Sequence, residues 1–93
     1  MQDITVQPVA PEEFRVRVTE NGTSTVHLVR VSSKTRARYS PHASGQRLVE
    51  ESFKFLLERE RKETISHSFE LPMIDRLYPE YRDEIARRLG ESR

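Results

Sequence analysis

The sequence predicts an α+β fold in which a small antiparallel sheet, either a hairpin or three strands, packs on one main helix and two short C-terminal helices. Residues 45–63 contain apolar side chains at helical spacings of three, four and seven residues, which predicts the main helix. Residues 14–32 alternate apolar and polar side chains around an Asn-Gly pair, which is typical of a hairpin. Residues 69–90 contain two prolines, each followed by a short run with helical apolar spacing.

The length of 93 residues predicts one small domain over residues 1–93. A domain of this size buries roughly 60 to 65% of the surface of its unfolded chain, so a deep active-site cleft is not expected. The absence of cysteine excludes disulfides, thiolate metal sites and cysteine nucleophiles. Neither an export signal nor a long apolar run is visible, which predicts a cytoplasmic protein that does not contact a membrane.

The strand region leaves two alternatives open. Residues 1–13 alternate apolar and polar side chains but contain two prolines, which fits either an edge strand or a loose arm. Within residues 14–32, Asn21-Gly22 predicts a type I′ turn. The apolar residues of the second strand change parity at Leu28 and Val29, which indicates either a β-bulge or a strand with both faces partly covered.

The connection before the main helix is rich in Ser, Arg and Lys. Residues 33–44 contain almost no apolar anchor besides Tyr39, and we expect this basic connection to be mobile. Ser40-Pro41 and Ser44 are alternative N-terminal caps of the main helix, so its start is defined only to within about four residues.

The net charge of +1 conceals a strongly basic segment. No acidic residue occurs between Glu20 and Glu50, and this interval carries a local charge of +5 from Arg30, Lys34, Arg36, Arg38 and Arg47. The rest of the chain therefore has a formal charge of −4. These five residues are candidate contacts for nucleic acid or an acidic partner. The alternative is a solvated stretch that docks on the molecule's own acidic helix.

The ionisable residues form no catalytic or metal-binding pattern. The three histidines are far apart, and no pair has the spacing of a helical metal site. Ser66, His67 and Ser68 are neighbours in sequence, but no oxyanion-hole or nucleophile-elbow pattern accompanies them. The glycines are scattered, so no phosphate-binding loop is present. We predict no enzyme activity, cofactor, metal or small-molecule substrate.

Four blocks of the sequence resemble a family of small uncharacterised bacterial α+β proteins. In order, the blocks are LVEESF, FLLERE, FELPMI and YPEY, at residues 48–53, 55–60, 69–74 and 78–81. The resemblance covers residues 14–85 and implies a bacterial origin and a hairpin before the helix. It implies no function, and the basic connection of residues 33–44 departs from the family pattern.

A second resemblance is to ribbon-helix-helix DNA-binding proteins, and it rests on Val29-Arg30-Val31-Ser32 followed by a Ser44-capped helix. In that family, dimers insert a two-stranded ribbon into the major groove. The resemblance implies base contacts by His27, Arg30 and Lys34, with phosphate at the helix start. Residues 34–43 depart from the pattern because they offer no amphipathic stripe, and the preceding strand lies outside that fold.

The leading functional prediction is a non-catalytic protein-interaction or regulatory module. Tyr78 and Tyr81 lie beside mixed charge and are candidate anchors for an unidentified protein partner or for self-association. The alternative is a nucleic-acid-binding regulator that uses the basic segment 30–47, with an affinity that falls steeply with salt. A third interpretation is a folded domain whose charges serve only solubility. Dimerisation through the sheet edge is also expected, because a lone hairpin is marginal in water.

Overall fold

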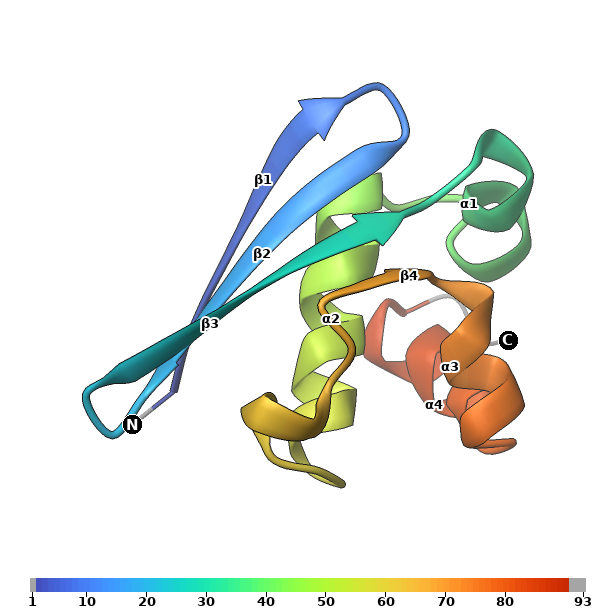
Figure 1. The fold of residues 1–93 in the computed structure, drawn as a ribbon. Helices are drawn as coiled ribbons and strands as arrows, with labels where there is room; N and C mark the ends of the chain where they lie inside the picture. Colours follow the sequence, from blue (N-terminus) through green and yellow to red (C-terminus); the bar gives the residue numbers. More distant parts are fainter. Residues whose placement is uncertain (1, 91–93) are drawn as a thin grey trace.

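The computed structural model describes residues 2–90, and residues 1 and 91–93 lie outside the described part. Four strands and four α-helices confirm the predicted α+β class (Figure 1). The strands are β1 Gln2–Ala10, β2 Glu13–Glu20, β3 Thr23–Arg30 and β4 Ser68–Glu70. The helices are α1 Ser33–Tyr39, α2 Gly45–Leu57, α3 Pro72–Leu77 and α4 Tyr81–Arg88, with a 3-10 turn, η1, at Lys62–Thr64.

The sheet has the order β1-β2-β3-β4, and the helices lie on one side of it (Figure 1). The first three strands are antiparallel neighbours, whereas β4 runs parallel to β3. Asn21 and Gly22 have φ angles of 56° and 80°, which matches the predicted type I′ turn. For the N-terminal segment, the edge strand is the correct alternative. Pro8 fits there because an edge strand has one side without ladder hydrogen bonds.

Of the two alternatives for β3, the β-bulge is wrong. β2 and β3 pair residue by residue along their whole length, without a shift in register. The buried side of β3 holds His27 and Val29, whereas Val26 and Leu28 lie on the other side, each 40% exposed. The parity of the apolar residues changes because a histidine, not an aliphatic residue, occupies a core position.

The expectation of a mobile connection is wrong for residues 33–39, which form helix α1. The Ser32 hydroxyl caps this helix by accepting a hydrogen bond from the Thr35 amide at 3.1 Å. Tyr39 is buried at its other end, where its hydroxyl donates to the Asp75 carboxylate at 2.8 Å. One cap and one buried aromatic side chain therefore hold a helix that has no apolar stripe.

Helix α2 forms the centre of the core and is buried on two sides. Ser44 is its N-terminal cap, so this alternative is the correct one. Toward the sheet, the ring of Phe53 lies 5.2 Å from His27 and 6.1 Å from Phe69. Toward the C-terminal helices, the ring of Phe55 lies 5.2 Å from Tyr81.

The main helix ends at Leu57, earlier than the predicted residue 63. Residues 58–63 offer no apolar side chain that would keep a helix against the core. The chain instead turns through η1 and buries Ile65. It then continues into β4, a strand absent from the predicted fold because Phe69 is its only apolar residue.

Strand β4 covers the edge of β3 that would otherwise be open. Leu28, Val29 and Arg30 pair with the three residues of β4, and the Leu28 amide donates to the His67 carbonyl at 2.7 Å. Since β3 has neighbours on both sides, it cannot form the intermolecular ribbon of ribbon-helix-helix proteins. Dimerisation through the open edge of β1 remains a prediction.

His27 is a polar residue in the core. Its Nδ1 lies 2.8 Å from the Ser66 carbonyl oxygen and its Nε2 lies 2.9 Å from the Thr25 hydroxyl. A carbonyl can only accept, so Nδ1 carries the proton and Nε2 accepts from Thr25. Burial lowers the pKa of His27, and the nearby His67 lowers it further, although the Ser66 hydrogen bond acts in the opposite direction.

The free energy of unfolding is expected to fall as the pH drops below about 6.5, the ordinary histidine pKa. Below that pH the unfolded chain binds a proton that the folded chain resists, so protonation favours the unfolded state. Urea unfolding at neutral and mildly acidic pH should show this loss in the wild type and a smaller loss in His27→Gln. Equal pH dependence of the two proteins would contradict the role assigned to His27.

Candidate functional site

The five predicted basic contacts do not form one surface. Three of them, Lys34, Arg36 and Arg38, lie exposed on α1, where they make no ion pair within residues 2–90. Arg30 lies at the end of β3, with a guanidinium nitrogen 3.6 Å from the Glu13 carboxylate. Arg47 lies in the first turn of α2 and donates to the Arg88 carbonyl at 3.3 Å. The basic segment is thus divided among three elements.

The hydroxyl groups of both predicted tyrosine anchors form hydrogen bonds within the domain. Tyr81 is fully buried, and its hydroxyl lies 2.6 Å from the Ser52 hydroxyl, so Tyr81 as a surface anchor is wrong. Burial raises the pKa of Tyr81 far above its ordinary value. Tyr78 is half-buried, and its hydroxyl donates to the Glu60 carboxylate at 2.6 Å. An arrangement of this kind leaves little of either side chain for a partner.

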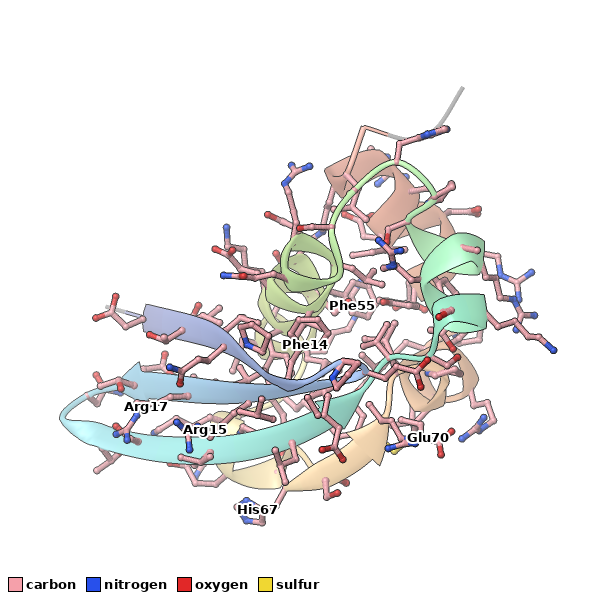
Figure 2. The ribbon with its side chains drawn as sticks, turned by 90° about the horizontal axis from the view of Figure 1, so that it is seen from above. Phe14, Arg15, Arg17, Phe55, His67 and Glu70 are labelled. Carbon is pink, nitrogen blue, oxygen red and sulfur yellow. The ribbon has the colours of Figure 1, made fainter. Side chains whose placement is uncertain are left out.

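The outer face of the sheet, the side that faces away from the helices, carries exposed arginine and aliphatic side chains. Val16 and Val18 of β2 point into the core, so Arg15 and Arg17 point outward by the alternation of a strand. Figure 2 shows these arginines close together along β2, with Phe14 toward the helices.

Two cross-strand rows form the centre of this outer face. In one row Arg17 lies between Thr5 of β1 and Val26 of β3. In the neighbouring row Arg15 lies between Gln7 of β1 and Leu28 of β3. Each row therefore presents a polar side chain, a guanidinium and an aliphatic side chain, in that order. We call these six residues the arginine face.

Neither arginine of the arginine face makes an ion pair within residues 2–90. Arg15 donates to the neutral Gln7 side chain at 2.9 Å, and the Arg17 side chain makes no hydrogen bond or ion pair within residues 2–90. The two Cα atoms are about 6.6 Å apart, the spacing of alternate strand residues. The acids of the outer face lie in other rows: Glu13 and Glu70 on either side of Arg30, and Asp3 opposite Thr19 in the row next to Arg17. The centre of the face is therefore positive, with carboxylates at both ends.

A shallow hollow of about 230 Å³ lies on the arginine face. Its lining comprises Thr5, Gln7, Arg15, Arg17 and Val26. Guanidinium groups are strong donors to carboxylates, and Val26 offers apolar contact beside them. The lining contains no carboxylate, histidine or lysine. This arrangement suits binding of an anionic group that has apolar neighbours.

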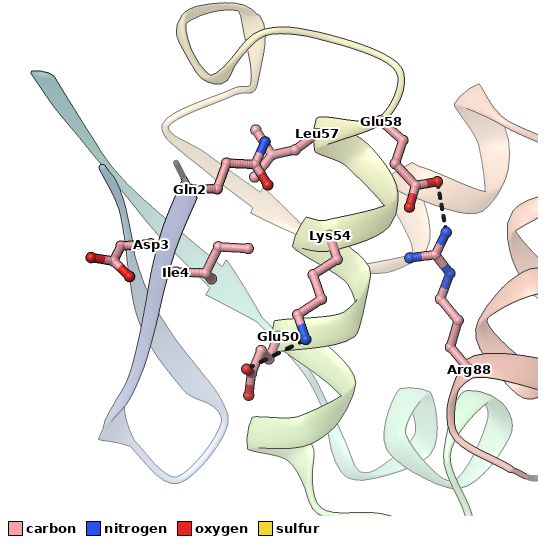
Figure 3. Close-up of a pocket in the computed structure, with 8 residues that line it drawn as sticks. All are labelled: Gln2, Asp3, Ile4, Glu50, Lys54, Leu57, Glu58 and Arg88. Carbon is pink, nitrogen blue, oxygen red and sulfur yellow. Dashed lines mark hydrogen bonds and ion pairs between the residues drawn. The ribbon is translucent and has the colours of Figure 1, made fainter. Parts of the chain in front are cut away.

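A larger hollow of about 470 Å³ lies between β1 and α2 (Figure 3). Its charged side chains largely satisfy one another, since Lys54 lies 3.9 Å from Glu50 and Arg88 lies 2.7 Å from Glu58. It is therefore a weaker candidate for a ligand site than the arginine face.

Within residues 2–90, no group of three or more His, Cys, Asp or Glu side chains could hold a metal. No helix in this range is long and apolar enough to cross a membrane.

The sequence contains a signal for the arginine face, although the face is not an acid-free basic segment. Glu12, Glu13 and Glu20 flank Arg15 and Arg17, so these arginines do not stand out as a run of positive charge. The strand alternation alone places both arginines on one face, away from the core.

Comparison with protein-family models, curated proteins and solved structures found no match to this chain.

Proposed function

We propose that the protein is a non-catalytic interaction module that binds an acidic segment of a partner protein across its arginine face. The observation that carries this proposal is the pair Arg15 and Arg17, which make no ion pair within residues 2–90 and lie beside the exposed aliphatic residues Val26 and Leu28. Uncompensated cations next to apolar surface fit a ligand that alternates carboxylates with apolar side chains.

The aliphatic half of the arginine face favours a protein over a nucleic acid. Val26 and Leu28 are each 40% exposed and give no advantage in binding a phosphate backbone. Sheets that bind single-stranded nucleic acid stack the bases on aromatic side chains, and the outward-facing residues of β1, β2 and β3 include none. An acidic peptide with Val or Leu between its carboxylates would cover both halves of the face.

The expected affinity is modest. Exposed ion pairs contribute about 0.2 to 1 kcal/mol each, so the arginines supply orientation and association rate more than binding energy. The aliphatic contacts add about 25 cal/mol per Å² of buried apolar surface, reduced by the cost of ordering the peptide. Binding in the micromolar range is expected for such a small face, and it should weaken as salt rises.

A fluorescein-labelled peptide of alternating Glu and Val residues is a suitable probe, measured by fluorescence anisotropy at low salt. We expect saturable binding to the wild type and at least about tenfold weaker binding to Arg15→Glu/Arg17→Glu, because the substitution replaces two attractions by two repulsions. A peptide with Gln in place of Glu should bind weakly to both proteins.

The matched control is Lys34→Glu/Arg36→Glu, which changes the net charge by the same amount on α1 instead of the sheet. This variant should bind the acidic peptide like the wild type does, apart from a small long-range effect. Equal loss of binding in the two variants would show that net charge alone attracts the peptide. That result, or equal affinity for the Glu and Gln peptides, would overturn the proposal.

Nucleic-acid binding through α1 is the second candidate function. The supporting observation is the group Lys34, Arg36 and Arg38, which are exposed and make no ion pair within residues 2–90. Anisotropy with a labelled DNA duplex separates it from the first candidate. Binding that Lys34→Glu/Arg36→Glu abolishes, Arg15→Glu/Arg17→Glu preserves and salt weakens steeply would favour this second function.

A further inference from the structure

A separate basic recess lies on the helix side of the sheet, where α1, α3 and α4 meet (Figure 1). Its volume is about 290 Å³. Three arginines line it, each from a different helix: Arg38 from α1, Arg76 from α3 and Arg82 from α4. The rest of the lining consists of Tyr39, Pro72 and Asp75. The fold therefore brings together three cations that are distant in sequence.

Asp75 organises one side of this recess. Its carboxylate accepts the Tyr39 hydroxyl at 2.8 Å and an Arg82 guanidinium nitrogen at 3.0 Å. Burial alone would raise the pKa of Asp75, but the hydrogen bonds from Tyr39 and Arg82 outweigh it and hold the pKa below its ordinary value. Asp75 is thus ionised at neutral pH, and it fixes Arg82 at the rim.

Arg38 and Arg76 remain available for a ligand. Arg38 lies over the Tyr39 ring, with its guanidinium carbon 5.6 Å from the ring centroid, and makes no ion pair within residues 2–90. Arg76 is exposed and makes neither a hydrogen bond nor an ion pair within the same range. Asp75 attracts Arg38 as well as Arg82, and the lining as a whole, with three arginines and one aspartate, has a formal charge of +2.

We propose that this recess binds the dianionic phosphoryl group of a small phosphate monoester, held by Arg38 and Arg76 with Arg82 as a third donor. Guanidinium groups match the geometry of phosphate oxygens and bind them with paired hydrogen bonds. A charge of +2 complements a monoester, which carries close to two negative charges at neutral pH, better than a diester with one. The site is distinct from the arginine face, so the two proposals can fail independently.

Isothermal titration calorimetry with glycerol 3-phosphate in low-salt buffer tests the proposal. We expect binding at about pH 7.5 that weakens about tenfold at about pH 5, because the second pKa of a phosphate monoester is about 6. Sulfate, a dianion at both pH values, should bind equally at both. Inorganic phosphate measured alongside shows whether the phosphoryl group alone is recognised or the organic ester is required.

Arg38→Gln/Arg76→Gln should weaken glycerol 3-phosphate binding by at least about tenfold, since charge-assisted hydrogen bonds to both side chains are lost. Both side chains are exposed, so the variant should fold, as a thermal melt will verify. Lys54→Gln/Arg61→Gln removes the same charge at exposed positions outside both the recess and the arginine face, and it should leave this affinity unchanged.

Three results would overturn the proposal. The first is no heat of binding with glycerol 3-phosphate or inorganic phosphate at millimolar concentrations. The second is an equal loss of affinity in Arg38→Gln/Arg76→Gln and in the control variant, which would indicate diffuse electrostatic attraction. The third is tight binding of duplex DNA that depends on Arg38 and Arg76 while glycerol 3-phosphate does not bind, which would assign the recess to a nucleic-acid backbone.

Discussion

Phe55→Ala is expected to lower the free energy of unfolding by about 3 to 5 kcal/mol, the range for removing a buried aromatic ring. Phe55 is fully buried between α2 and the C-terminal helices, with its ring 5.2 Å from Tyr81 and 5.9 Å from Tyr78. The guanidinium carbon of Arg59 lies 3.7 Å from the ring centroid. Alanine would leave a cavity and remove all three contacts at once.

Loss of this size is a large part of the roughly 5 to 15 kcal/mol that stabilises a domain. Chemical denaturation monitored by circular dichroism measures it. Leu77→Ala is the matched control, since Leu77 is 55% exposed and should change the free energy of unfolding by less than about 0.5 kcal/mol. A change below about 1 kcal/mol in Phe55→Ala would contradict the packing of α3 and α4 on α2.

Ser52→Ala is expected to cost about 1 to 3 kcal/mol although it removes only one oxygen atom. The Ser52 hydroxyl lies 2.7 Å from the Leu48 carbonyl, to which it donates, and 2.6 Å from the Tyr81 hydroxyl. All of these groups are buried, so alanine leaves the Tyr81 hydroxyl without its partner in the core. An unsatisfied buried donor is costlier than the loss of an average hydrogen bond.

A double-mutant cycle separates this effect from the loss of packing. Ser52→Ala leaves the Tyr81 hydroxyl without a hydrogen-bond partner, and Tyr81→Phe removes that hydroxyl. The double variant should therefore be more stable than the sum of the two single losses predicts. Urea denaturation of the four proteins gives the coupling free energy. Strict additivity would mean that the two hydroxyls do not interact in the folded protein.

Local patterns predicted the parts of the fold whose signals lie close together in the chain. Asn21-Gly22 located the hairpin, and the spacing of residues such as Phe53 and Leu56 located α2. Helix α1 was missed because one cap and Tyr39 hold it, and neither produces an apolar stripe. The end of α2 was predicted too late because the charged residues 58–63 suit a helix surface, although they offer no apolar side chain that packs against the core.

The candidate sites depend on tertiary proximity, which a search along the chain does not detect. The arginine face follows from strand alternation, but the neighbours of Arg15 and Arg17 are set by pairing with β1 and β3. The basic recess joins Arg38 to Arg76 and Arg82 only because α1, α3 and α4 pack together. Tyr81 looked available because sequence does not distinguish a core tyrosine from a surface one.

The central claim is that the arginine face is the surface that binds an acidic partner. Amide chemical-shift mapping of the isotopically labelled protein with the Glu-Val peptide tests this claim most directly, because it reports which residues change on binding. The largest shifts are predicted at Arg15, Arg17, Val26 and Leu28, with little change in α1. The claim would be contradicted by chemical-shift changes confined to the helices. It would also be contradicted by the absence of chemical-shift changes when the peptide is present in large excess.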